Sequence, residues 1–119
     1  MTKGALHTKS FAFAVRIINL YKFLCSDKKE YVLAKQLLRS GTSIGALIRE
    51  ADQAESKLDF IHKLSIALKE STETEYWILL LRETDYLNIS QAESILVDNK
   101  ELLKLLTSII KTSKCRLKK

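Results

Sequence analysis

The chain of 119 residues contains no proline and only three glycines. Proteins built from β-hairpins use these residues in tight turns, whereas helix interiors exclude proline and are weakened by glycine. The composition therefore favours an all-α protein. A chain of this length buries about two-thirds of its unfolded surface, so it forms a single stable domain without a metal ion or a disulfide.

Cysteine and histidine are also scarce. Cys25 and Cys115 lie far apart and match no zinc motif, and a secreted domain of this size usually carries more cysteine. Neither His7 nor His62 follows a glutamate by three residues, as the ligands of a di-iron bundle do. The sequence also lacks a glycine-rich phosphate loop and a nucleophile elbow. We therefore predict no catalytic site, no metal site and no cofactor, reduced thiols, and a structural or surface position for His62.

Long hydrophobic runs are missing as well. Residues 11–15 are apolar, but Arg16 follows at once, which leaves too short a core for a signal peptide. Residues 77–81 form the longest other run, far below the ~20 residues of a membrane-spanning helix. We expect a soluble cytoplasmic protein without a targeting segment and without a membrane partner.

The charges are unevenly distributed along the chain. Residues 102–119 contain six Lys/Arg and no acidic residue, a net charge of +6. Residues 1–49 contain nine Lys/Arg and two Asp/Glu, a net charge of +7, whereas residues 50–101 contain five and twelve, a net charge of −7. An acidic middle between basic ends permits contact with nucleic acid, or self-association of opposite faces.

Apolar residues recur at helical spacing in four segments, which are residues 9–25, 30–54, 56–85 and 90–113. The third segment opens with Ser56 and the fourth with Ser90, each followed three residues later by an acidic residue, as at capped helix starts. Short polar breaks separate the segments, so consecutive helices run antiparallel. We predict one domain, residues 1–119, folded as an antiparallel up-down-up-down four-helix bundle, with residues 1–8 and 114–119 flexible.

The first helix is apolar nearly all round, which indicates burial on more than one side. Its two apolar faces consist of Phe11, Ala14, Val15, Ile18, Tyr21 and Cys25, and of Phe13, Ile17, Leu20 and Leu24. One face can pack inside the bundle, and the other needs a second cover, most simply another subunit. We assign Phe13, Ile17 and Leu20 to that subunit contact.

Small residues fill the middle of the second helix, residues 40–46 (SGTSIGA). Gly41 and Gly45 each cost about 1 kcal/mol of helix stability relative to alanine. The compensation is the close approach of another helix, or of a partner, to the bare backbone. The alternative is a break that divides this segment into two shorter helices.

A basic stripe, Lys35, Arg39 and Arg49, lies opposite the apolar stripe of the second helix. It has three interpretations: contact with a phosphate backbone, an ordinary solvated face, or ion pairs with an acidic stripe of a neighbouring subunit. That acidic stripe would lie on the third helix, away from its core face, and it adds four candidates for subunit contact: Ile66, Glu70, Glu73 and Trp77. Further candidates for phosphate contact are Arg16, Lys22, Lys114 and Arg116.

Two blocks of the chain resemble a known family. Residues 36–46 (QLLRSGTSIGA), followed by Glu50 and Ala51, form the first block, and residues 59–70 (DFIHKLSIALKE), continued by residues 73–77 (ETEYW), form the second. They resemble the bacterial four-helix-bundle proteins that are encoded in intervening sequences of 23S rRNA genes. The resemblance covers nearly the whole chain, although the first and last helices match only in pattern.

This family is similar to the accessory variability protein of diversity-generating retroelements, a basic pentamer that partners a reverse transcriptase and binds nucleic acid. The resemblance implies a homopentameric ring and, less directly, nucleic-acid binding. The first hypothesis is therefore a non-enzymatic homo-oligomer, a pentamer, that contacts RNA or a nucleic-acid-binding protein through the basic candidates. The second is a structural or protein-interaction oligomer in which basic and acidic stripes pair between subunits without nucleic acid.

Overall fold

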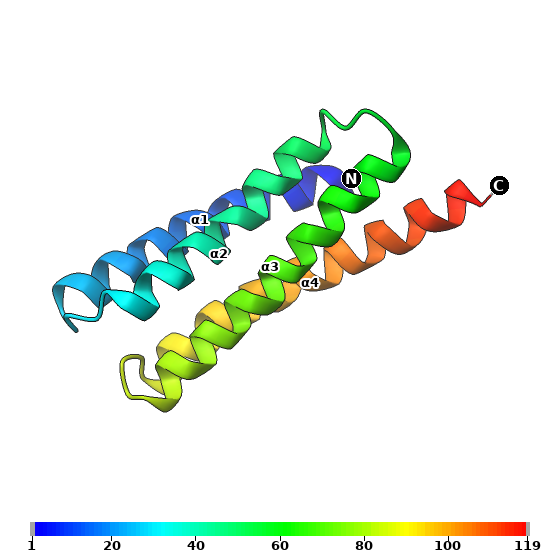
Figure 1. The fold of residues 1–119 in the computed structure, drawn as a ribbon. Coiled ribbons are helices and arrows are strands. Elements are labelled where there is room, and N and C mark those ends of the chain that lie inside the picture. Colours follow the sequence, from blue (N-terminus) through cyan, green and yellow to red (C-terminus); the bar gives the residue numbers. More distant parts are fainter. Residues whose placement is uncertain (1, 119) are drawn as a thin grey trace.

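The computed structural model describes the backbone of residues 2–118 and the side chains of residues 4–118. It contains four α-helices: α1 (Thr2–Ser26), α2 (Val32–Ala51), α3 (Lys57–Glu83) and α4 (Ile89–Leu117). Figure 1 shows two antiparallel hairpins, α1–α2 and α3–α4, that lie side by side. Each helix packs against two others, since α1 and α3 both contact α2 and α4. The predicted antiparallel four-helix bundle is confirmed.

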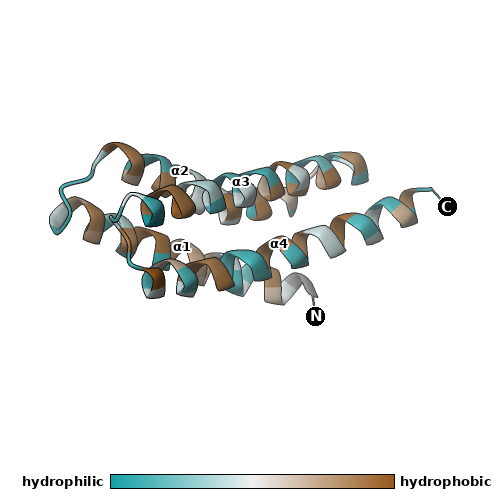
Figure 2. Ribbon diagram, turned by 90° about the horizontal axis from the view of Figure 1, so that it is seen from below, coloured by the Kyte–Doolittle hydropathy of each residue, from teal (hydrophilic) through white to brown (hydrophobic). Residues whose placement is uncertain are grey.

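The first and last helices are longer than the sequence predicted. Helix α1 begins at Thr2, well before residue 9, and α4 continues past residue 113 to Leu117. Most of the two terminal segments that we predicted to be flexible is thus helical. Leu6 gives the physical reason at the first end, because its side chain is only 2% exposed and anchors the first turns of α1 in the core. The end of α4 extends beyond the other three helices (Figures 1 and 2).

Side-chain caps fix the starts of α3 and α4, and the cap of α4 differs from the sequence prediction. Ser56 Oγ accepts a hydrogen bond from the Asp59 N–H at 3.0 Å, as expected for α3. The capping box of α4, however, consists of Asn88 and Gln91, not Ser90 and Glu93. Asn88 Oδ1 accepts from the Gln91 N–H at 2.7 Å, and the Asn88 N–H donates to Gln91 Oε1 at 3.0 Å. The helix therefore begins one residue before Ser90.

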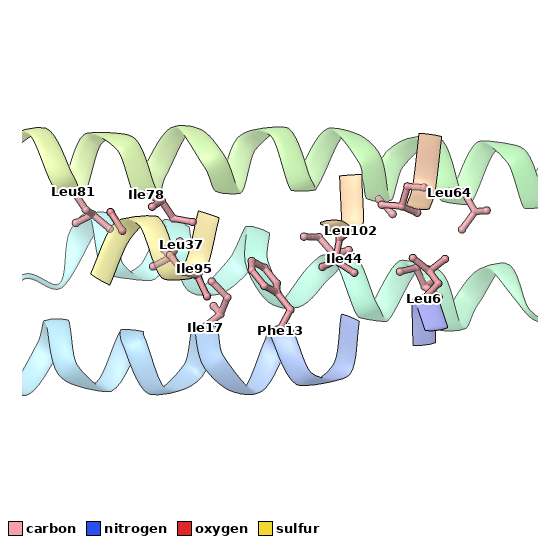
Figure 3. Close-up of a cluster of buried hydrophobic side chains, with 14 of the residues drawn as sticks. Leu6, Phe13, Ile17, Leu37, Ile44, Leu64, Ile78, Leu81, Ile95 and Leu102 are labelled. Carbon is pink, nitrogen blue, oxygen red and sulfur yellow. The ribbon is translucent and has the colours of Figure 1, made fainter. Parts of the chain in front are cut away.

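The core is a continuous row of aliphatic side chains along the bundle axis (Figure 3). Helix α2 passes unbroken through its small residues, so the alternative of two shorter helices is wrong. A Cβ atom on Gly41 would lie 2.7 Å from Ile17 Cγ1, which shows that α1 makes the predicted close approach to the bare backbone. At Gly45 the nearest atom, the Ser10 carbonyl oxygen, is at an ordinary 3.5 Å.

Two polar pairs interrupt this apolar row. Asn99 on α4 accepts from Ser71 Oγ at 2.9 Å and donates to the Ser71 carbonyl at 3.0 Å. Thr74 Oγ1 donates to Ser40 Oγ at 3.0 Å, which joins α3 to α2. All four residues are buried. Because a buried polar group must find its partner, these pairs favour one register of α3 against each neighbour.

Candidate functional site: the charged and apolar outer faces

Arg39 of α2 contacts two carboxylates at once. Its Nη1 donates to Glu70 Oε1 at 3.3 Å, and its Nη2 contacts Glu73 Oε2. Both glutamates lie on α3 of the same chain. One of the three interpretations of the basic stripe paired it with the acidic stripe of a neighbouring subunit, but for Arg39 the chain itself supplies that acidic stripe. Arg39 has its charge compensated and is a poor candidate for a phosphate contact.

Trp77, one turn after Glu73 on α3, belongs to the same cluster. Its indole Nε1 donates to Glu73 Oε2 at 2.9 Å, so the ring meets the carboxylate by a hydrogen bond as well as by packing. This bond, together with the Arg39 guanidinium, lowers the pKa of Glu73. The hydrogen bond to Glu73 in turn raises the pKa of Arg39. Glu70, Glu73, Trp77 and also Ile66 are half-buried in the single chain.

Arg16 of α1 is occupied in a similar way. Its Nη1 lies 2.6 Å from Asp98 Oδ2 and donates to the Ser94 carbonyl at 3.2 Å, while Nη2 donates to Ser94 Oγ at 2.8 Å. A second ion pair, Lys9 with Glu101 at 3.0 Å, spans the same two helices. These contacts join α1 to α4, the least extensive of the four helix–helix interfaces. Arg16 therefore holds α1 against α4, and its guanidinium is already bonded within the chain.

The other basic candidates are not engaged. Among the residues that the structure describes, Lys22, Lys35 and Arg49 have no ion-pair partner, and all three are exposed. Lys114 and Arg116 are exposed on the projecting end of α4. Two side chains of the basic stripe can therefore contact a phosphate: Lys35 near the start of α2 and Arg49 near its end.

Many acidic side chains of residues 50–101 form contacts with basic side chains of the same chain. Seven of its twelve acidic side chains take part in ion pairs with basic side chains of the described region: Glu50, Asp52, Glu70, Glu73, Glu83, Asp98 and Glu101. An eighth, Asp59, accepts a hydrogen bond from the Glu55 N–H at the start of α3. Each of these ion pairs also occupies a basic side chain, so the pairing leaves the net charge of the chain unchanged.

The two apolar faces of α1 are placed the opposite way from our prediction. Phe13 and Ile17 are 1% and 0% exposed and lie in the core (Figure 3), and Leu20 is half-buried against it. These residues cannot contact another subunit while the bundle is folded, so the assignment of Phe13 and Ile17 to a subunit contact is wrong.

The uncovered face of α1 is the other one. Phe11, Val15 and Ile18 are 61%, 44% and 39% exposed and follow one another at helical spacing. The exposed apolar stripe, as we call these three residues, borders a hollow between α1 and α2. Ala14, Ala46 and Arg49 are among the residues that line the hollow. Small residues of α2 thus extend the apolar face beyond α1.

The histidines are separated in space and differ in environment. His7 Nε2 lies 2.6 Å from Asp52 Oδ2, a contact between α1 and the residue after α2 that no local pattern of the sequence predicted. His62 is exposed on α3, which is the second of the two positions, structural or surface, that the sequence left open. Within the described residues, no group of three or more His, Cys, Asp or Glu side chains is placed to hold a metal ion. None of the four helices, in the part that is described, is long and apolar enough to cross a membrane.

The sequence profile of one family matches residues 4–108, which includes most of all four helices: the 23S rRNA-intervening sequence proteins. The chain belongs to this family. A crystal structure of a protein of unknown function from the S23 ribosomal protein family of Bacteroides thetaiotaomicron VPI-5482 is 60% identical in sequence and superimposes with a TM-score of 0.93. The match covers 93% of this chain and 99% of that chain. No curated protein matches. The family resemblance inferred from the two sequence blocks is confirmed.

Proposed function

We propose that this chain is a non-enzymatic bundle that assembles into a homopentameric ring and binds RNA, alone or within a nucleoprotein. One observation carries the proposal: Lys22, Lys35 and Arg49 are exposed and have no ion-pair partner among the described residues, whereas Arg39 of the same basic stripe is already paired within the chain. Unpaired cations on a helical surface attract phosphate backbones. The Bacteroides relative is assigned to a ribosomal protein family, which favours RNA as the polyanion.

The exposed apolar stripe supports the assembly. Three large apolar side chains lie in a row on one helix beside the small residues of α2, and a contiguous exposed apolar surface of this kind is typical of a contact between proteins. A ring needs a contact between two different faces of the chain, and the resemblance to a pentameric family gives the number of subunits. Repetition around a ring would place five copies of each weak phosphate contact within reach of one RNA.

The alternative, an oligomer held by pairing of the basic and acidic stripes, has less support. Arg39 is the central residue of the basic stripe, and it already contacts both glutamates of the acidic stripe within one chain. A subunit contact through these charges would have to break that cluster first. An apolar contact through α1 requires no such rearrangement.

RNA binding is tested with a double variant, Lys35→Gln with Arg49→Gln, against a fluorescently labelled structured RNA at low salt. Loss of phosphate contacts should weaken binding by about tenfold or more. Lys69→Gln with Lys104→Gln is the matched control, because these exposed lysines lie on α3 and α4 and the net charge changes equally. Equal weakening in both double variants would reduce the effect to net charge and contradict a binding face on α2.

Assembly is tested separately by light scattering. The parent chain should have a native mass near five chains, and Val15→Glu should shift the mass toward one chain because a charge in an apolar contact is costly to desolvate. Val97→Glu is the matched control, since Val97 is also exposed but lies on α4 outside the stripe. A monomeric parent chain would refute the ring, and a Val15→Glu variant that keeps the parent mass would place the contact elsewhere.

A further inference from the structure

A hollow of about 260 Å³ opens at the end of the bundle where α4 projects. It is bounded by the first turns of α1 and α3, the last turns of α2, and the C-terminal part of α4. Figure 1 shows that α4 leaves the bundle here at an angle to α3. The four helices therefore no longer fill the space between them with their own side chains.

The floor of this hollow is apolar. Leu6, Ile48 and Leu64 line it, and each is no more than 2% exposed. Leu6 and Leu64 approach each other at the end of the core row in Figure 3, so the hollow continues the core outward. An apolar cavity of about 150 Å³ accepts a benzene molecule. The larger hollow here has room for a ring or a short alkyl chain.

The rim of the hollow is cationic. Arg116 lines it from the last turn of α4. A smaller adjoining hollow, of about 200 Å³, shares Arg116, Phe60 and Ser113 with it and adds Lys57, the first residue of α3. Neither cation has an ion-pair partner among the described residues. The positive end of the α3 dipole lies on the same side.

The hollow is also lined by one carboxylate. Oδ2 of Asp52 is 2.6 Å from Nε2 of His7, which lines the hollow too. This acid is therefore held by a contact within the chain, and two cations, Arg116 and Lys57, stand against it. Hydroxyl groups of Ser108, Thr112 and Ser113 provide further hydrogen-bonding groups on the α4 side. An apolar floor, a cationic rim and a few polar groups are the usual composition of a small-molecule site.

We propose that this hollow binds a small amphipathic carboxylate, with its apolar body against the half-buried Phe60 and Ile109, above the buried floor, and its carboxylate at Arg116 and Lys57. A guanidinium recognises a carboxylate through two parallel hydrogen bonds, which a neutral rim cannot provide. The site lies at the opposite end of α2 from Lys35, and the three cations that carry the proposed RNA contact, Lys22, Lys35 and Arg49, do not line it. Its existence is therefore independent of the function proposed above.

The test is calorimetric titration of the full chain, in its native assembly and without RNA, with octanoate, 1-octanol and acetate. Octanoate carries both the chain and the charge, octanol only the chain, and acetate only the charge. We expect octanoate to bind at least about tenfold more tightly than either of the others, because both parts of the site contribute. Equal affinity for octanol would show an apolar hollow without anion recognition, and equal affinity for acetate would show surface ion binding. Either result overturns the proposal.

Two variants place the ligand. Arg116→Gln should weaken octanoate binding about tenfold by removal of a charge-assisted hydrogen bond, whereas Lys111→Gln, an exposed cation of the same helix that does not line the hollow, should leave it unchanged. Ser113→Phe puts a ring where the two hollows meet and should abolish binding with the helical circular dichroism retained. Parent affinity in Arg116→Gln or in Ser113→Phe would overturn the assignment.

Discussion

At the scale of single residues, the two glycines of α2 have different roles although they share one sequence motif. A Cβ atom at position 41 would overlap Ile17, which is buried and has no room to move aside. A Cβ atom at position 45 would meet the Ser10 backbone at van der Waals distance. The first glycine is therefore required by packing, and the second only weakens the helix.

We predict that Gly41→Ala destabilises the protein by about 1–3 kcal/mol through overpacking. Gly45→Ala should be neutral or stabilise by up to about 1 kcal/mol, because alanine favours the helix and fits the space. Urea unfolding of both variants beside the parent chain measures the difference. Similar stabilities for the two variants would mean that α1 does not approach α2 as closely as the structure shows.

Glu73 is a second residue whose properties depend on specific neighbours, in this case through its pKa. Its pKa is lowered from 4.5, first by the Trp77 N–H and then by Arg39. A carboxyl group whose pKa is lower in the folded chain stabilises the fold above its ordinary pKa, and that contribution is lost as the pH falls through the folded-state value. Glu73 is about one-third exposed, so solvent screens the ion-pair part of the effect.

We predict that Trp77→Phe moves the pKa of Glu73 back toward 4.5, because phenylalanine retains a ring but lacks the donor. Carbon NMR of the labelled carboxyl group during a pH titration measures this value directly. Tyr76→Phe is the control, since Tyr76 touches the Trp77 ring edge without bonding to Glu73. An unchanged Glu73 pKa in Trp77→Phe would assign the whole shift to Arg39.

At the scale of the helix, the start of α4 shows how two nearby patterns compete. Asn88 with Gln91 and Ser90 with Glu93 both fit a capping box. The burial of Leu87 decides between the two capping boxes. Its side chain is 2% exposed, and this anchor ends the turn between α3 and α4 directly before Asn88. Asn88 then follows in extended geometry and caps the helix, which leaves Ser90 inside the first turn.

We predict that Asn88→Ala lowers the free energy of unfolding by about 1 kcal/mol, the usual cost of a lost cap. Ser90→Ala should have almost no effect, because Ser90 is exposed and its side chain makes no cap hydrogen bond. Thermal and urea denaturation of the two variants separate these outcomes. A larger loss for Ser90→Ala than for Asn88→Ala would move the start of α4 back to the position that the sequence suggested.

At the scale of the whole molecule, charged and apolar surfaces serve different contacts. The unpaired cations Lys22, Lys35 and Arg49 act over a distance that salt shortens to about 8 Å at physiological ionic strength. The exposed apolar stripe depends on the removal of apolar surface from water, which salt does not weaken. The proposed RNA contact and the proposed subunit contact should therefore respond differently to salt.

We predict that raising the salt concentration from about 50 mM to 500 mM releases bound RNA while the native mass of the protein stays near five chains. Light scattering with absorbance at 260 and 280 nm on the same chromatographic peak follows both quantities. A ring that dissociates together with its RNA would indicate that charge, and not the stripe on α1, holds the subunits. RNA that remains bound at high salt would contradict a contact made through phosphates.

Local patterns were sufficient for the parts of this protein that depend on neighbours in sequence. Helical spacing of apolar residues and the absence of proline indicated four helices, and the short breaks between them indicated their antiparallel order, because an amphipathic helix follows a repeat of 3.6 residues. The small-residue segment around Gly41 also predicted a close helix contact correctly. The two sequence blocks were enough to indicate the family.

Only the tertiary structure decided which of two equally apolar faces of α1 points inward, since both follow the same repeat and the choice depends on how Phe13 and Ile17 fit against α2. It also decided the partners of Arg39, the contact of His7 with Asp52 across 45 positions, and the hollow beside Arg116. Each of these joins residues of different helices. Periodicity specifies the direction of a side chain on its own helix, but the distance to another helix is set by the packing of the whole bundle.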